Sequence, residues 1–300
     1  MSQAAIKTKK LSKRYDHAPS YALKDLSIEV QPGEVYGFLG PNGAGKSTTI
    51  RTLLNFIQPT SGTARILDLD IVRASVKLRG NVGYLSGEFK LYEGLTGQQF
   101  LDYMGQLQSP KSQNQRQKLV ERFEAELHKP AGDLSKGNRQ KLGLIQAFMH
   151  EPAVLILDEP TSGLDPLMQE AFFQLVRESK ENGAALFISS HNFSEVLRMC
   201  DRVGFIRSGE LVGEETISDL QDKAAHSFVI TFAKTAPVSE LEQIKQATIV
   251  SHDDHTVRLR LEGDLTPLFR VLASHKVQRL DQETANLEEE FLQFYEGDKK

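Results

Sequence analysis

The sequence predicts an α/β protein whose core is a sheet of buried parallel strands. The first observation is a pair of short apolar runs, AVLIL at 153–157 and ALFIS at 185–189, each with the length of a strand. The second is a helical stretch from about 166 to 181, which lies between these runs. Strands that alternate with helices are covered on both faces, and such strands are typically parallel and apolar throughout. We expect this core to end near residue 220.

The segment before the core is predicted to begin as antiparallel β-structure. Residues 21–39 contain two strand-like runs, separated by the turn pair Pro32-Gly33. The second run leads directly into a glycine-rich loop, GPNGAGKS at 40–47, and a predicted helix follows that loop. A further short strand, NVGYL, is predicted at 81–85.

The pattern of apolar residues becomes helical between about 95 and 130. Thr96 and Gln99 fit a capping box at the start of a helix. Apolar residues then recur on two helical stripes, namely Phe100, Tyr103, Met104 and Leu107, followed by Leu119, Phe123 and Leu127. We interpret both stripes as helix packing rather than as a ligand site. They predict a helical subdomain at about 88–150, inserted in a first domain that spans 1–220.

Residues 221–300 are predicted to form a second, smaller α+β domain. The expected elements are a strand at 227–233, a helix at 237–246, strands at 247–252 and 256–263, a helix at 265–275 and a strand at 277–283. This βαββαβ order is typical of a ferredoxin-like split fold. A final amphipathic helix is expected at 286–297. The segment shows no phosphate loop, ligand cluster or basic patch.

The composition narrows the possible partners. With 39% hydrophobic and 25% charged residues the 300-residue chain is an ordinary globular sequence, and its net charge of −4 argues against a nucleic-acid partner. The single cysteine, Cys200, excludes an intrachain disulfide, and we expect it to be buried because it precedes a strand-like run. No run approaches ~18 apolar residues and the N-terminus lacks the apolar centre of a signal peptide, so we expect a cytoplasmic protein.

The glycine-rich loop carries the first chemical signal. Residues 40–47 match GxxxxGK[ST] in full, between a predicted strand and a predicted helix. Glycines allow successive backbone N–H groups to turn toward a phosphate, and the helix start adds partial positive charge. Lys46 can reach the β- and γ-phosphates, and the Ser47 hydroxyl can bind Mg²⁺. The sequence therefore predicts nucleoside triphosphate binding on a P-loop NTPase core.

Two carboxylates and a histidine follow the buried strands. Asp158 and Glu159 come directly after VLIL, at the carboxyl edge where open α/β sheets bind ligands. Asp158 is expected to hold Mg²⁺, directly or through water, because Mg²⁺ takes few carboxylates and keeps several waters. Glu159 is expected to act as a base or to orient the attacking water. His191 follows the neighbouring strand, where its ring can reach a γ-phosphate.

Five motifs in a fixed order carry a family resemblance. GPNGAGKST, LSKGNRQK, LILDEP, SGLD and SSH, which lie within residues 4–220, resemble the ATP-binding subunit of an ABC transporter. Within that superfamily, LSKGNRQKLGLIQAFMHEP and the tail NLEEEFLQFYEG resemble the ATPases of ABC-2-type exporters, including drug and antibiotic resistance ones.

The resemblance implies a role for each matching residue. The implied nucleotide-loop contacts are Asn42, Gly43, Gly45, Lys46, Ser47 and Thr48. Asp158 is implied as the Walker B carboxylate that holds Mg²⁺ with Ser47, Glu159 as the catalytic glutamate, and His191 as the switch histidine. Asp165 in SGLD matches the D-loop aspartate at a dimer seam. Tyr15 resembles the aromatic residue that stacks on adenine, although taken alone it reads as a packing residue.

The stretch DLSKGNRQK at 133–141 resembles the signature motif LSGGQ. Ser135 and Gly137 match, which implies that they contact the ATP held by Lys46 and Ser47 of a second copy in a homodimer. Lys136 departs from the common form, and so does Asn138. We expect the added charge of Lys136 to suit an anion site and to alter the strength of the dimer.

A second departure follows the predicted strand at 81–85. The family usually has a glutamine there, which touches Mg²⁺ and senses the membrane subunit, but this chain has Gly87 at that position. One interpretation is that the loop keeps its hinge role without this ligand. Our hypothesis is that the adjacent Glu88 partly replaces the glutamine.

The resemblance implies an ATPase that powers a separate integral-membrane permease. ATP and Mg²⁺ are the expected cofactors, and the expected location is cytoplasmic, peripheral on the inner face of the cell membrane. The expected cargo of an ABC-2-type exporter is a drug, antibiotic, lipid or polysaccharide. The alternative is a soluble ABC ATPase acting on ribosomes or DNA, which the single GxxxxGK[ST] and the absence of a heptad run disfavour. A regulatory module without turnover is disfavoured by the presence of Glu159 and His191.

Overall fold

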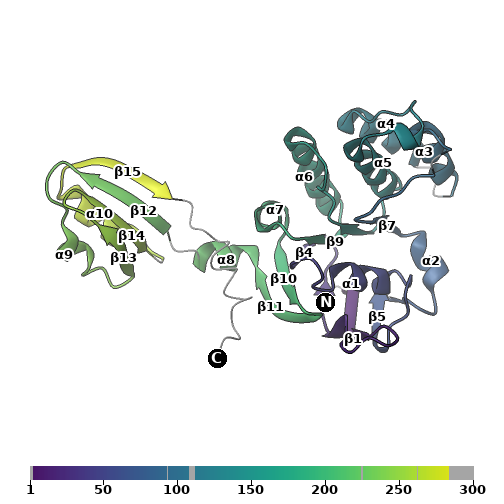
Figure 1. Ribbon diagram of the computed structural model, residues 1–300, viewed down its shortest axis with the longest axis horizontal. Helices are drawn as coiled ribbons and strands as arrows, with labels where there is room; N and C mark the ends of the chain where they lie inside the picture. Colours follow the sequence, from purple (N-terminus) through teal and green to yellow (C-terminus); the bar gives the residue numbers. More distant parts are fainter. Residues whose placement is uncertain (1–2, 93, 108–111, 224–225, 262, 284–300) are drawn as a thin grey trace. The chain divides into compact units, whose positions relative to one another are not determined.

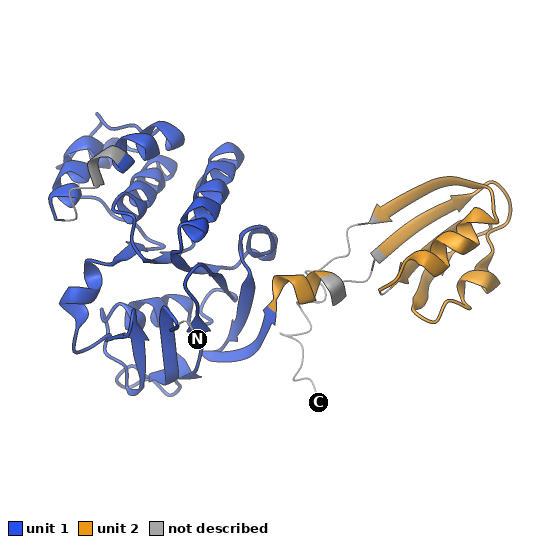
Figure 2. Ribbon diagram, turned by 180° about the vertical axis from the view of Figure 1, so that it is seen from behind, with its two compact units in different colours: residues 1–215 blue, residues 216–300 orange. Residues whose placement is uncertain are grey.

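The computed structural model describes residues 3–92, 94–107, 112–223, 226–261 and 263–283. The chain divides into two compact units, residues 1–215 and 216–300, each of which is described by itself (Figure 2). The sequence placed the corresponding boundary at 220, which lies within a short helix, α8 (Ile217–Lys223).

The core of unit 1 is a six-stranded sheet in the order β11-β10-β4-β9-β8-β7 (Figure 1). Its strands are β4 (Val35–Leu39), β7 (Val82–Leu85), β8 (Val154–Asp158), β9 (Ala185–Ser190), β10 (Arg202–Arg207) and β11 (Glu210–Thr216). The pairs β10–β4, β4–β9, β9–β8 and β8–β7 are all parallel. Every residue of β4, β8 and β9 is buried, as expected for strands covered on both faces. The predicted parallel core is confirmed.

A second sheet of unit 1 is antiparallel. It contains β1 (Ile6–Lys13), β2 (Leu23–Leu26), β3 (Glu29–Val30), β5 (Ser61–Ile66) and β6 (Leu69–Asp70). The sequence predicted that the strand-like run just before the glycine-rich loop also belongs to the antiparallel structure, and that prediction was wrong. It forms β4, which lies between β10 and β9 in the parallel sheet, because its apolar residues are buried on both faces.

Helices cover the sheets and form the inserted subdomain. They are α1 (Lys46–Leu53), α2 (Ser75–Arg79), α3 (Gly97–Gln106), α4 (Ser112–Phe123), η1 (Ala131–Asp133), α5 (Lys136–Phe148), α6 (Pro166–Glu181) and α7 (Phe193–Met199). The capping box of α3 is present, with both Thr96–Gln99 bonds formed. Phe100 and Phe123 are buried, but Tyr103 and Leu107 are exposed because α3 turns Leu101 rather than Tyr103 inward. The predicted first stripe was therefore wrong in part.

Unit 2 has the predicted βαββαβ order. Its elements after α8 are β12 (His226–Phe232), α9 (Val238–Leu241), β13 (Ala247–His252), β14 (Thr256–Leu261), α10 (Thr266–Ala273) and β15 (Val277–Glu283). The sheet order β13-β14-β12-β15, with all neighbours antiparallel, is that of a ferredoxin-like fold. The helix predicted at 237–246 is confined to α9, and the helix predicted at 286–297 lies outside the described residues.

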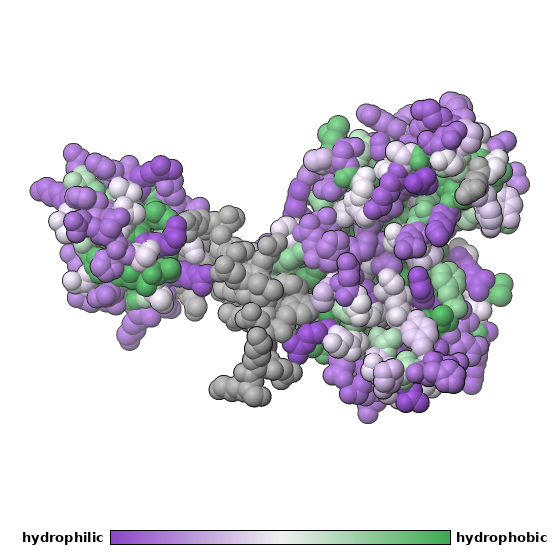
Figure 3. Space-filling view, in the orientation of Figure 1, coloured by the Kyte–Doolittle hydropathy of each residue, from purple (hydrophilic) through white to green (hydrophobic). Residues whose placement is uncertain are grey.

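The two units have separate apolar cores. The core around Phe38, Ile156 and Phe187 belongs to unit 1, whereas Ile230, Leu259 and other residues of unit 2 form their own cluster. None of the helices in the described ranges has the length and apolar character needed to cross a bilayer. On the face shown in Figure 3, hydrophilic side chains predominate over both units and apolar ones form small groups.

Candidate functional site

The glycine-rich loop joins the end of β4 to the start of α1. Gly43 has φ 81° and Gly45 has φ 114°, in the left-handed region that favours glycine. A Cβ atom at Gly45 would also lie 2.7 Å from the carbonyl oxygen of Ala22. The loop therefore keeps the open backbone turn that presents N–H groups to a phosphate only with glycine at these positions.

Lys46 is the first residue of α1, and only 6% of it is exposed. Its Nζ donates to the carbonyl oxygens of Gly40, at 2.6 Å, and Pro41, at 3.3 Å. It also forms an ion pair with Glu159, whose Oε1 lies 3.2 Å from Nζ. An ammonium has three N–H donors, so a phosphate oxygen would bind Lys46 by replacing one of these three acceptors.

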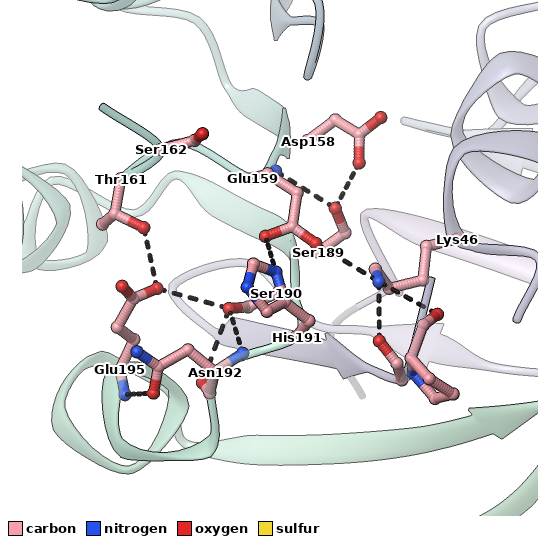
Figure 4. A network of polar contacts seen from close by, with 12 residues as sticks. Lys46, Asp158, Glu159, Thr161, Ser162, Ser189, Ser190, His191, Asn192 and Glu195 are labelled. Atoms are coloured by element: carbon pink, nitrogen blue, oxygen red, sulfur yellow. Dashed lines mark hydrogen bonds and ion pairs between the residues drawn. The ribbon is translucent and has the colours of Figure 1, made fainter. Parts of the chain in front are cut away.

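The carboxylates Asp158 and Glu159 lie at the carboxyl end of β8 (Figure 4). Asp158 is buried and accepts a short hydrogen bond from Ser189 Oγ on β9. Glu159 adopts a left-handed backbone conformation with φ 49°, and its N–H donates to Ser189 O at 3.2 Å. The neighbouring strand thus fixes both carboxylates at one edge of the sheet.

The Glu159 carboxylate lies between two basic groups. His191 Nδ1 lies 2.7 Å from Oε2, while Lys46 Nζ lies on the side of Oε1 (Figure 4). Among the described residues, the buried Oε1 has no hydrogen-bond partner of good geometry. Oε1 therefore faces the charge of Lys46 without a directed hydrogen bond and keeps a lone pair that can accept a proton, as a base requires.

A polar network fixes the loop that follows Glu159. Thr161 Oγ1 donates to Glu195 Oε2 at 2.7 Å, and Ser190 Oγ lies 3.3 Å from the same oxygen (Figure 4). Asn192 caps α7 by accepting from the Glu195 N–H. Sequence reasoning missed Thr161 and Glu195, since neither belongs to a motif whose chemistry names it.

The glycine-rich loop, the start of α1, the two carboxylates after β8 and His191 line one cavity of about 700 Å³, a size typical of small-molecule sites. Of the predicted residues, Asn42, Gly43, Gly45, Lys46, Ser47, Thr48, Asp158, Glu159 and His191 line it. Sequence reasoning did not single out Arg51, Tyr84, Ser86, Lys90 and Ser162, which also line it. Arg51 had a signal, because it lies one helical turn after Ser47 on the same face of α1.

One tyrosine of the cavity has a shifted pKa. Burial raises the pKa of Tyr84, and the negative charge of Asp158 adds to the increase, while Arg51 and a hydrogen bond with Ser86 oppose it. Tyr84 is therefore a neutral phenol at physiological pH.

Magnesium needs few protein ligands at such a site. Ser47 and Asp158 line the same cavity, and one hydroxyl with one carboxylate is a typical protein contribution to Mg²⁺ beside phosphates. Within the part of the chain that the structure describes, no group of three His, Cys, Asp or Glu side chains is arranged to hold a metal. The donor set therefore fits a Mg²⁺ ion that is bound mainly by phosphate and water.

The helix start at α5 is a separate polar surface. Ser135 is the N-cap, and its Oγ accepts the N–H of Asn138 at 3.1 Å. A Cβ atom at Gly137 would lie 2.8 Å from the carbonyl oxygen of Gly163, so only glycine fits there. Neither Ser135 nor Gly137 lines the 700 Å³ cavity.

Comparison with known proteins decides the family. The family model described as ABC transporter matches residues 23–162. The bacitracin transport ATP-binding protein BcrA of Enterococcus faecalis is 34% identical over 259 residues, which covers 85% of this chain and 83% of BcrA. The chain belongs to the ABC transporter family.

Two further proteins show the extent of the match. The probable multidrug ABC transporter ATP-binding protein YbhF of Escherichia coli is 35% identical over 230 residues, or 75% of this chain, but this chain spans only 39% of YbhF. A solved structure titled as the ATP binding subunit of an ABC transporter is 30% identical, with a TM-score of 0.67 over 72% of this chain and 92% of that one. The ABC fold is thus shown for unit 1.

Two predicted ABC positions, Tyr15 and Asp165, do not line the cavity. The hydroxyl of Tyr15, which is 40% exposed, lies 3.4 Å from Thr48 Oγ1 and thus beside the nucleotide loop. Asp165 caps α6 by accepting the Met168 N–H at 3.0 Å, and it does not line the cavity. In this single chain the structure assigns Asp165 a helix-capping contact.

Gly87 lies against the Asp158 carboxylate in this ABC chain. A Cβ atom at Gly87 would be 3.3 Å from Asp158 Oδ2, which is tighter than most real contacts. Glu88 lines the same cavity and is exposed. The side chain absent at Gly87 therefore leaves one face of Asp158 open, with Glu88 next to it.

Proposed function

We propose that this chain binds and hydrolyses ATP in the cavity between the glycine-rich loop and the end of β8. The observation that carries the proposal is the Glu159 carboxylate, whose Oε1 lies 3.2 Å from Lys46 Nζ and whose Oε2 lies 2.7 Å from His191 Nδ1. The names of the relatives, which are transport ATP-binding proteins, support the same assignment.

The side chains at the cavity would share the work of hydrolysis. The loop N–H groups and Lys46 would hold the β- and γ-phosphates, and Tyr15 would stack on the adenine. Ser47 and Asp158 would hold Mg²⁺, which neutralises phosphate charge when it is bound. Glu159 would take the proton of the water that attacks the γ-phosphorus, while the bond to the β-phosphate oxygen breaks and ADP leaves. His191 would orient Glu159 through its 2.7 Å contact.

Two copies would complete the reaction. The α5 start, with Ser135 and Gly137, would meet the γ-phosphate of the ATP held by a second copy, because exposed helix N–H groups bind anions. Asp165 would lie at the same seam. This gives a head-to-tail homodimer with two nucleotides between the copies.

The permease would dock beside the cavity. A second hollow of about 530 Å³ lies between residues 87–91 and the first turns of α5, where Arg139 and Gln140 line it. It borders Gly87, so a membrane partner seated there would move the loop next to Asp158. We propose that the chain acts at the inner face of the membrane on a separate exporter permease, with a drug or antibiotic as the cargo.

Purified protein with MgATP tests the catalytic proposal. We expect phosphate release that depends on Mg²⁺ and on protein concentration, since the active species is a dimer. Absence of hydrolysis with retained ATP binding would contradict it. Co-purification of a multi-span membrane protein with the tagged chain tests the permease, whereas co-purification of ribosomes would favour the alternative.

A further inference from the structure

Lys136 occupies an unusual electrostatic position at the start of α5. It is the first residue of the helix, where the backbone N–H groups already carry partial positive charge, and the first turn contains no acidic residue. Its ammonium donates to Ser162 Oγ at 3.1 Å. Among the described residues, Ser162 Oγ is the partner that the structure gives to Lys136 Nζ. The charge is thus held by a neutral hydroxyl.

The contact joins the α5 start to the loop that follows Glu159. The Lys136 methylenes pack over Gly163, where an added Cβ would lie 3.4 Å from the Cγ and Cδ atoms. Ser162 lines the nucleotide cavity of its own chain, and its N–H bonds to Glu159 O at 3.2 Å. Lys136 therefore touches a loop that belongs to the site of the same copy.

We propose that Lys136 is a phosphate contact of the dimer seam, held on Ser162 until the nucleotide of the second copy arrives. This inference rests on the proposed function and adds one residue and one exchange step to it. Lys136 is exposed, as is the N-cap Ser135 beside it. Its ammonium sits on a flexible four-carbon stem, so it can leave Ser162 and bind a γ-phosphate oxygen.

Lys136 should prefer the phosphate to Ser162 because the phosphate is charged and the hydroxyl is neutral. A hydrogen bond from an ammonium to a phosphate oxygen is charge-assisted and stronger than one to a neutral hydroxyl. A phosphate at the α5 start also removes the unfavourable pairing of Lys136 with the positive helix end. Closing the dimer would therefore free the Ser162 hydroxyl in each copy, at the edge of the cavity that holds that copy's own ATP.

Matched variants in the Glu159→Gln background test the proposal, since we expect ATP hydrolysis to be much slower there. Lys136→Met removes the charge and keeps a flexible stem, Lys136→Arg keeps the charge, and Ser162→Ala removes the hydroxyl that holds Lys136. The measurements are the ATP affinity of the single chain and the dissociation constant of the dimer with MgATP, by sedimentation at about 50 and 500 mM salt.

We expect Lys136→Met to raise the dimer dissociation constant at least about tenfold at low salt and less at high salt, with the ATP affinity of the single chain unchanged. Lys136→Arg should keep most of the affinity. Ser162→Ala should tighten the dimer, because Lys136 no longer has a competing partner. If Lys136 only supported the loop, Ser162→Ala would weaken the dimer as Lys136→Met does, and the proposal would be wrong.

Failure of the underlying function gives a different result. Absence of ATP binding or of an ATP-dependent dimer in the Glu159→Gln parent would contradict the proposed function itself. A parent that dimerises normally, together with a Lys136→Met variant of equal affinity at both salt concentrations, would overturn the role of Lys136 alone.

Discussion

At the scale of single residues, Glu159 combines the features of a base that remains available. It is half-buried, paired with His191 on one oxygen and near Lys46 on the other. A carboxylate bonded on every lone pair could not accept a proton from water. Oε1 has an ion pair with Lys46 but no hydrogen bond among the described residues, so it keeps a lone pair for that proton.

Replacing Glu159 by glutamine should separate binding from turnover. The amide keeps the shape of the side chain but cannot take a proton, so we expect ATP hydrolysis to fall at least about 100-fold while ATP still binds. Phosphate release and nucleotide binding would be measured side by side. Glu181→Gln, on an exposed residue at the end of α6, is the control. Ordinary turnover in Glu159→Gln would refute the proposed mechanism.

Glu88 is expected to contribute to the use of Mg²⁺. It lines the cavity beside Gly87, which leaves the face of Asp158 open. Glu88→Ala should raise the Mg²⁺ concentration that gives half-maximal hydrolysis, measured by titration of the metal at saturating ATP. If neither the Mg²⁺ dependence nor transport-coupled hydrolysis changes, the hypothesis that Glu88 replaces the usual glutamine fails.

His150, just after α5, should make stability depend on pH. Burial lowers the pKa of His150, although hydrogen bonds with the backbone of Val82 and Gln146 oppose the decrease. The unfolded chain then binds the proton more tightly, so stability is full above the ordinary histidine value of ~6.5 and decreases as pH falls below it. Urea unfolding at about pH 7.5 and 5.5 should show a larger loss for the wild type than for His150→Gln. An equal loss would show that other groups cause it.

At the scale of elements, the contacts of Asn138 give a structural reason for this departure from the signature motif. Its Oδ1 accepts the Glu126 N–H at 2.8 Å, and its Nδ2 donates to Glu126 O at 2.9 Å. The side chain thus forms hydrogen bonds with both the N–H and the carbonyl oxygen of a residue just beyond α4. This residue stabilises the inserted subdomain from within, and nothing in its contacts involves the cavity.

Removing that side chain should loosen the subdomain. Asn138→Ala leaves two half-buried backbone groups of Glu126 unpaired, so we expect a loss of about 1–3 kcal/mol in the free energy of unfolding. Chemical denaturation measures the loss. Asn182→Ala, at the exposed end of α6, should change stability much less. Similar losses in both variants would contradict the role of Asn138.

The elements show what the sequence could reveal. Strands such as β8 and β9 were predictable because burial on both faces makes them apolar throughout. β1 was not singled out, since its burial alternates irregularly and it carries a bulge next to Lys10, with φ 46°. Its lysines gave no clear strand pattern. The predicted starts of helices agree with the structure where the sequence contains an N-cap residue, as at Thr96 and Asp165.

The site residues that belong to a known sequence motif could be predicted from the sequence. The glycine-rich loop and the carboxylates after β8 could be placed together, because parallel strands end at one edge. Tyr84, Lys90 and Ser162 reach the cavity from loops or from a strand end, and only the folded chain brings them there. The Lys136–Ser162 contact spans 26 positions of sequence and has no local signal.

At the scale of the whole molecule, the two separate cores should unfold as two transitions. The described residues that line the nucleotide cavity all belong to unit 1. A ligand stabilises the part of the protein that binds it, so MgATP should raise one melting temperature in calorimetry and leave the other unchanged. Leu259→Ala, in the core of unit 2, should lower only the other transition. A single transition that shifts as a whole would contradict the prediction.

The chain has one cysteine, and its thiol is buried at the end of α7. Burial raises the pKa of Cys200, and the charge of Asp201 adds to the increase, so its reactive thiolate is suppressed. Maleimide reagents should therefore leave the native chain unlabelled. Gly132, where an added Cβ would meet nothing within 4 Å, is a suitable place for a single introduced cysteine. A fluorophore attached there, four residues before α5, would report optically on a second copy arriving at Lys136 without any change to the native thiol.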